Sequence, residues 1–118
     1  MGKDESLEDV MNNKACRFIR KLKSGRPQTI VAYGTSLTAG ASWVGALQGA
    51  LIAKYPKLAK VINSGEGEKC SIWGLQNLNE RVIAKMPDAV FIEFSINDAH
   101  LPYKMTLDDS KNNLNKMA

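Results

Sequence analysis

Residues 29–40 (TIVAYGTSLTAG) constrain the fold of this chain more than any other part of the sequence. The first five of them are apolar or β-branched, which is typical of a buried strand. Gly34 ends this run, and a helix is predicted to begin at Leu37. Ser36 is therefore predicted to lie on a tight turn at the carboxyl end of a strand, where open α/β sheets bind their ligands.

A serine on such a turn can act as a nucleophile, or it can cap the helix. Its hydroxyl can point outward, and its N–H can help to hold an oxyanion. Thr35 and Ser36 are both good N-cap residues, so this stretch taken alone favours the capping role. The case for chemistry depends on two later stretches.

The chain has 118 residues, a length that suits one small domain. We see no apolar run as long as a membrane span and no secretory signal, and we expect a cytoplasmic protein. Cys16 and Cys70 lie in unrelated contexts, with neither a metal-binding spacing nor a clear disulfide framework. The sequence therefore predicts no metal site and no cofactor.

Basic residues are concentrated between Lys14 and Arg26, and the formal net charge of the chain is +4. Such a segment can bind nucleic acid or acidic lipid. Only one aromatic residue, Phe18, lies among these charges, and no binding motif accompanies them. We interpret the segment as the solvated face of a helix and expect no nucleic-acid partner.

Apolar periodicity predicts strands that alternate with helices. The predicted helices are residues 6–24, 43–55, 73–85 and a last one from Thr106, and the predicted strands are 29–33, 59–62 and 89–94. The second helix is predicted to turn Trp43, Leu47, Leu51 and Ile52 inward. We divide the chain into an N-terminal helix with a linker, residues 1–27, and an α/β domain, residues 28–118. The alternation predicts a parallel sheet with strand order 2-1-3.

The loops that follow parallel strands open on the same edge of a sheet. Here that edge is predicted to bring together Ser36, the glycine-bearing loop of residues 63–71, and the stretch Asn97-Asp98 with His100. These three polar stretches are far apart in the sequence.

These stretches resemble the sequence blocks of the SGNH/GDSL hydrolases. Residues 34–37 (GTSL) resemble the Gly-Asp-Ser-Leu block, residues 63–67 the Asn-x-x-x-x-Gly block, and residues 95–98 (SIND) the Gly-x-Asn-Asp block. The resemblance covers about residues 28–118, which correspond to the N-terminal half or so of a typical family domain. It implies a flavodoxin-like three-layer α/β/α fold, here truncated to three strands.

The resemblance also implies a serine esterase or lipase-like hydrolase that acts on a small-molecule ester through an acyl-enzyme. Ser36 would be the nucleophile. The oxyanion would be held by the N–H of Ser36, by a backbone N–H of the second block and by the side-chain amide of Asn97. Glu68 stands where the family has a glycine of the oxyanion hole, and Gly67 could serve if the loop shifts by one residue.

Other side chains are candidates for the substrate pocket. The first group consists of Thr35, Trp73, Asp98 and His100. A second group, Trp43, Ile72, Leu101 and Tyr103, could line an acyl or sugar pocket, although core packing explains the tryptophans equally well.

The chain departs from the family at the general base. The family takes this base from a late Asp-x-x-His block, and the sequence ends at Ala118 before any such block. His100, the single histidine, is expected to lie in a loop wall or in the substrate pocket, or to be a partly exposed polar residue. A role as an improvised base is the less favoured alternative. Thr35 and Ser95 also replace the usual Asp and Gly of the first and third blocks.

The third predicted strand, from Ala89 to Phe94, would lie at an edge of the sheet. It is apolar on both faces apart from Glu93, and such edges invite pairing. We therefore expect a fragment of a longer protein, completed by the missing C-terminal half or by self-association through this strand.

Two other functions stay open from the sequence. One is a non-catalytic binding or assembly module of the same fold, which Glu68 and the missing base favour. The other is a flavodoxin-like phosphate or flavin binder that uses the loop of residues 34–38 as an anion cradle. The lack of further glycines in that loop and the Asn97-Asp98 block disfavour the second. The acyl group and the alcohol are not specified by the sequence.

Overall fold

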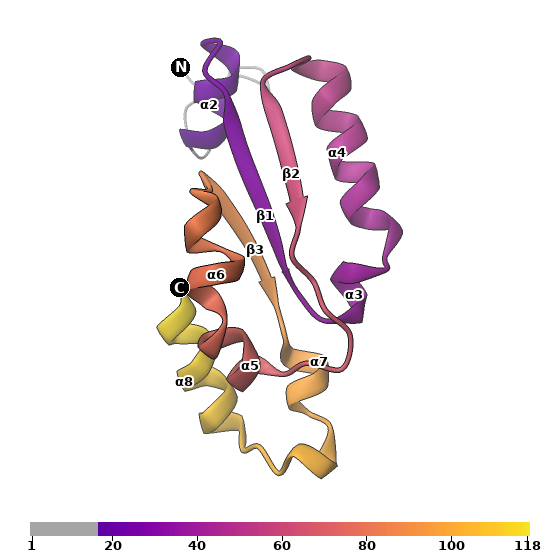
Figure 1. Ribbon diagram of the computed structural model, residues 1–118, viewed down its shortest axis with the longest axis vertical. Coiled ribbons are helices and arrows are strands. Elements are labelled where there is room, and N and C mark those ends of the chain that lie inside the picture. Colours follow the sequence, from indigo (N-terminus) through magenta and orange to yellow (C-terminus); the bar gives the residue numbers. More distant parts are fainter. Residues whose placement is uncertain (1–16) are drawn as a thin grey trace, which may run out of the picture.

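A three-stranded parallel sheet forms the centre of the protein in a computed structural model that describes residues 17–118 (Figure 1). The strands are β1 (Gln28–Gly34), β2 (Ala59–Asn63) and β3 (Ala89–Glu93). They lie in the order β2-β1-β3, and both neighbours of β1 run parallel to it. The predicted fold class and strand order are confirmed.

Helices cover both faces of the sheet and make three layers. They are α2 (Arg17–Lys23), α3 (Ser36–Ala39), α4 (Ser42–Lys54), α5 (Ser71–Gln76), α6 (Leu78–Arg81), α7 (Ser95–Asp98) and α8 (Leu107–Met117), with short 3-10 turns η2 (Ile83–Lys85) and η3 (Leu101–Tyr103). Part of the helix predicted over residues 6–24 lies outside the described residues. No helix of the described part is both long and apolar enough to cross a membrane.

Strand β1 is buried on both faces, which explains its apolar composition. Ile30 and Ala32 point into one core cluster, which α2 and α4 cover with Phe18, Leu22 and Val44. Val31 and Tyr33 point into a second cluster on the opposite face, which includes Val82, Phe94 and Met117. The alternation of side chains along the strand thus supplies both cores.

Helix α4 turns a different stripe inward from the one predicted. Val44 is buried, and Leu47 and Leu51 pack against the same core cluster. Trp43 and Ile52, which were predicted to point inward, are 37% and 44% exposed. The prediction was wrong for these two because, at about 100° per residue, they lie on opposite sides of the stripe that Val44, Leu47 and Leu51 form.

The single helix predicted over residues 73–85 is wrong. The segment is broken into α5, α6 and η2, and the first break lies at Asn77. The side-chain amide of Asn77 donates to the carbonyl oxygen of Trp73 at 2.9 Å. An asparagine that bonds locally in this way competes with regular helix geometry. Val82, beyond the break, is 4% exposed and lies in the core.

Tyr33 links the sheet to the helix layer of α5. Its side chain is 0% exposed, and its hydroxyl donates to the carbonyl oxygen of Gly74 at 2.7 Å. Gly74 has no room for a side chain, since a Cβ atom would lie 2.7 Å from the ring of Phe94. Burial raises the pKa of Tyr33 to about 12.

A Tyr33→Phe variant tests this link. At pH 8 we expect it to be less stable by about 1 kcal/mol, because a buried hydrogen bond is lost. The folded pKa lies above the ordinary value of 10.0, so wild-type stability should fall as the pH rises from 10 to about 12. The variant lacks this loss, so the difference in free energy of unfolding between wild type and variant should shrink over this pH range. Urea unfolding at several pH values measures it, and an identical pH dependence of both would contradict the prediction.

Candidate active site

Three segments meet in one open cavity at the carboxyl edge of the sheet. They are the start of α3 after β1, the loop after β2, and α7 with η3 after β3. The cavity has a volume of about 370 Å³ and is lined by Ser36, Glu68, Ile96, Asn97, His100 and Tyr103. The structure thus brings together the three polar stretches that the sequence predicted at this edge.

Ser36 is exposed at the first position of α3, and the residue before it holds the turn. Thr35 is the N-cap, and its hydroxyl oxygen accepts from the N–H of Leu37 at 3.2 Å. The same hydroxyl donates to the carboxylate of Glu93 on β3 at 2.6 Å, and the N–H of Thr35 donates to it at 3.2 Å. Thr35 is 0% exposed. Its predicted place in the substrate pocket is therefore wrong, because its hydroxyl is committed to Glu93.

Glu93 was missed as a positioning residue of this turn. Its carboxylate also accepts from the hydroxyl of Thr38 at 3.4 Å, so it ties β3 to both ends of α3. The close approach of β3 requires glycine at position 34, since a Cβ atom there would lie 2.5 Å from the carbonyl oxygen of Glu93. A lone carboxylate at the end of an apolar strand was the sequence signal that could have identified it.

The loop after β2 is seated directly on α3. The side-chain amide of Asn63 donates to the carbonyl oxygens of Thr38 and Ala39 at 2.9 and 3.3 Å. At Gly65 a Cβ atom would collide with the backbone nitrogen of Ala39. At Gly67 it would lie 3.7 Å from the Cβ of Ser36, so this part of the loop borders the serine.

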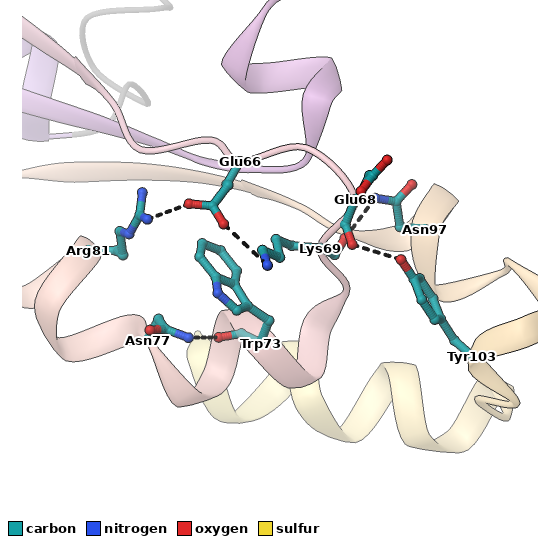
Figure 2. Close-up of polar contacts among 8 residues, drawn as sticks. All are labelled: Glu66, Glu68, Lys69, Trp73, Asn77, Arg81, Asn97 and Tyr103. Carbon is teal, nitrogen blue, oxygen red and sulfur yellow. Dashed lines mark hydrogen bonds and ion pairs between the residues drawn. The ribbon is translucent and has the colours of Figure 1, made fainter.

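Glu68 has the left-handed backbone conformation, with a φ of 63°. Residues with a Cβ atom pay roughly 1–2 kcal/mol for this conformation. The carbonyl oxygen of Glu68 accepts from the hydroxyl of Tyr103 at 2.7 Å (Figure 2). Next to it, the amide of Asn97 donates to the carbonyl oxygen of Lys69 at 2.7 Å. Two side chains from the segment after β3 thus hold the loop in its strained shape.

Trp73 lies outside the cavity, within a charged cluster on the neighbouring surface (Figure 2). Its ring is 5.1 Å from the guanidinium of Arg81 and 5.8 Å from the ammonium of Lys69. Both cations also pair with Glu66, at 2.6 and 3.4 Å. The hydrogen bond from Arg81 is the main reason that the pKa of Glu66 is lowered. The predicted pocket role of Trp73 is wrong, because its ring packs against Tyr33 and these cations.

Asp98 also lies away from the cavity and is 4% exposed. Its carboxylate accepts from the N–H of Ser71 at 2.7 Å and from the hydroxyl of Ser110 at 2.5 Å. It therefore joins α7 to the starts of α5 and α8. The prediction that Asp98 lines the pocket is wrong, because both of its oxygens face these helices.

His100 lines the cavity, which is one of the locations expected for it. Its ring meets the ring of Tyr103 edge-on, with 5.1 Å between the centroids. Neither His100 nor the hydroxyl of Ser36 has a side-chain hydrogen bond to any residue within 17–118. No group of side chains suited to hold a metal ion is found in the same range.

Solved structures similar to this chain include esterases and a lipase/acylhydrolase. A lipase/acylhydrolase from Enterococcus faecalis is 32% identical with a TM-score of 0.68, and the match covers 76% of this chain and 50% of that one. A catalytic mutant of an acetylxylan esterase from Geobacillus stearothermophilus is 27% identical with a TM-score of 0.68, over 78% of this chain and 53% of that one. TesA is 29% identical with a TM-score of 0.66, and the match covers 76% of this chain and 52% of TesA.

These three proteins are SGNH/GDSL hydrolases, so the resemblance noted in the sequence extends to the fold. The chain spans about half the length of the structures it matches. No protein-family model matches the sequence, and no curated protein matches it.

The strain at Glu68 leads to a stability prediction. A Glu68→Gly variant should be more stable by about 0.5–1 kcal/mol, because glycine adopts a positive φ without steric cost, and this gain exceeds the entropy it adds to the unfolded chain. A Glu68→Gln variant keeps the Cβ atom and should leave the stability unchanged. Thermal unfolding distinguishes the two. A Glu68→Gly variant that is less stable than wild type would contradict a strained backbone at this position.

Proposed function

From the similarity of this chain to the N-terminal half of the SGNH/GDSL hydrolases, we propose that it carries the nucleophile and the oxyanion-binding groups of a serine ester hydrolase. The observation that carries this proposal is the shared cavity of Ser36, Glu68 and Asn97. These residues come from segments that follow three different strands.

In the proposed reaction, the Oγ of Ser36 attacks the carbonyl carbon of an ester. The serine proton passes to a general base and then to the leaving alcohol as the bond between carbonyl carbon and alcohol oxygen breaks. Water then attacks the acyl-enzyme, which releases the acid and returns a proton to Ser36. Negative charge develops on the carbonyl oxygen in both halves of the reaction, so the site needs hydrogen-bond donors aimed at that atom.

Three groups at the cavity are the proposed donors. The N–H groups of Ser36 and Glu68 donate to no backbone or side-chain acceptor within residues 17–118. The amide of Asn97 has two hydrogens, of which the bond to Lys69 uses one. We propose that the remaining hydrogen and the two backbone N–H groups bind the oxyanion. The backbone N–H of Gly67, which lies next to Ser36, is the alternative to the N–H of Glu68 as the donor from this loop.

The general base is the missing part of the mechanism, since within residues 17–118 no side chain that could act as a base is hydrogen-bonded to the hydroxyl of Ser36. A serine without a base is a weak nucleophile at neutral pH. We propose that the base comes from polypeptide outside these residues, and that His100 forms part of the wall of the cavity.

The proposed substrate is a small ester with a short acyl group. The cavity, about 370 Å³ in volume, is at the small end of ligand sites. Its apolar wall consists of Ile96 and the ring of Tyr103. The names of the similar structures, an acetylxylan esterase and a lipase/acylhydrolase, describe ester substrates of those proteins and support this class.

A non-catalytic binding module is the second candidate. The exposed carboxylate of Glu68 at the cavity favours it, because a negative charge there opposes an oxyanion. If the chain is a binding module, replacing Ser36 should leave the rate of ester hydrolysis unchanged.

Hydrolysis of p-nitrophenyl acetate with added imidazole tests the proposed function. Imidazole can replace a missing general base. We expect a small rate without imidazole and a rate that rises with its concentration, both measured as the difference between wild type and the Ser36→Ala variant. Subtracting the variant also removes the direct reaction of imidazole with the ester. Equal rates for both proteins at every imidazole concentration would refute the esterase proposal for this chain and favour the binding module.

Two further variants assign the roles in the same assay. Asn97→Ala should lower the imidazole-dependent rate on the order of 10²-fold, because one oxyanion donor is removed. His100→Ala should leave the imidazole-dependent rate nearly unchanged. If His100→Ala instead abolishes a rate measured without imidazole, His100 is the base and our assignment of the base to other polypeptide is wrong.

A further inference from the structure

Strand β3 pairs with β1 on one side and leaves its other edge open (Figure 1). The N–H of Asp88 donates toward β1, to the carbonyl oxygen of Thr29 at 2.8 Å. Hydrogen-bonding groups alternate in direction along a strand, so Ala89, Phe91 and Glu93 turn their N–H and C=O groups to the open edge. Within the described residues nothing pairs with these groups.

Within residues 89–93, no charged side chain points to this edge. Natural edge strands are usually protected by exposed charges, prolines or bulges. The one charged side chain of β3, Glu93, is turned inward to Thr35 and Thr38. Asp88, just before the strand, accepts from the N–H of Thr29 at 2.8 Å. The carboxylate of Glu93 is therefore turned away from the open edge, and that of Asp88, although exposed, is hydrogen-bonded to β1.

Both faces beside the open edge are apolar. On one face the ring of Phe91 meets Trp43 edge-on, with 6.0 Å between the centroids. On the other face Val90 and Ile92 line a groove of about 780 Å³, whose remaining wall is almost entirely apolar. Large side chains at this edge are exposed in the isolated chain: Trp43 37%, Ile83 55%, Met86 82%, Val90 37% and Phe91 50%.

We propose that the open edge of β3 binds the same edge of a second copy of this chain. The two strands would run antiparallel about a two-fold axis at Phe91 and join two three-stranded sheets into one of six strands. This interface lies along β3 and does not depend on the proposed chemistry at Ser36.

The edge is self-complementary in this register. Phe91 faces Phe91 of the second copy and exchanges two backbone hydrogen bonds with it, as Ala89 does with Glu93 of the second copy. Val90 faces Ile92 of the second copy, so the two grooves join. No like charges stand directly opposite each other, and cross-strand aromatic and β-branched pairs stabilise antiparallel strands.

The apolar area matches what a small specific dimer needs. Aromatic side chains have roughly 150–250 Å² of surface, so with about 200 Å² taken for each residue the five exposed fractions given above amount to on the order of 500 Å² per copy. Two copies would bury roughly 1,000 Å², which reaches the lower limit for a specific interface.

The molar mass of the purified chain in solution is the first test. One chain has a mass of 13.0 kDa, and light scattering after size exclusion at 0.15 M salt should give twice this value at about 50 μM protein. A monomer at this concentration would overturn the proposal, and the edge would then be free for a strand of a longer polypeptide. Larger aggregates without a dimer would overturn it as well.

Matched variants locate the interface. Phe91→Lys places a charge at the two-fold axis and should give a monomer. Leu101→Lys is the control, because Leu101 is 87% exposed and lies on η3, away from β3. It should stay a dimer. A dimer that survives Phe91→Lys would overturn the proposal, and circular dichroism checks that both variants are folded.

A cross-link tests the register directly. Directly opposite hydrogen-bonded residues have Cα atoms about 5.5 Å apart, which suits a disulfide. In a chain with Cys16→Ser and Cys70→Ser, Phe91→Cys should form a covalent dimer on mild oxidation, and Leu101→Cys should not. Equal cross-linking of both variants would rule out the proposed register.

Discussion

The carboxylate of Glu93 is the contact on which the rest of the site depends. It lies at the end of β3 and accepts hydrogen bonds from Thr35 and Thr38, which flank Ser36 on the turn after β1. Gly34 allows the two strands to approach closely enough for these bonds. A parallel sheet brings strand ends to one edge, but side chains decide where each turn points. Here one carboxylate fixes the turn that presents Ser36.

The loop after β2 packs directly against that turn. Asn63 holds the loop against the carbonyl end of α3, and Gly65 permits the close contact. Tyr103 and Asn97 then bind successive carbonyl oxygens of the loop, which keeps Glu68 in its left-handed conformation. Strain held by surrounding contacts is common at functional sites. Within residues 17–118 the N–H of Glu68 has no protein partner.

The sheet and the position of Ser36 could be predicted from the sequence because they depend on short-range composition. The strands differ from prediction by no more than a residue at either end, and residues 95–98 follow β3 as expected. The roles of individual polar side chains could not be predicted. Thr35 and Asp98 bond to residues 58 and 27 positions away, and no local pattern encodes such pairs. The break at Asn77 was also missed, because apolar periodicity continues across it.

The claim that Ser36 and its neighbours form half of an ester hydrolase site is tested most directly with phenylboronic acid. Its boron accepts the Ser36 oxygen and becomes a tetrahedral anion that resembles the tetrahedral intermediate of ester hydrolysis. Calorimetric titration should show binding to the wild-type chain, no binding to Ser36→Ala, and affinity lowered on the order of 10²-fold in Asn97→Ala. Equal affinity for all three proteins would contradict the claim.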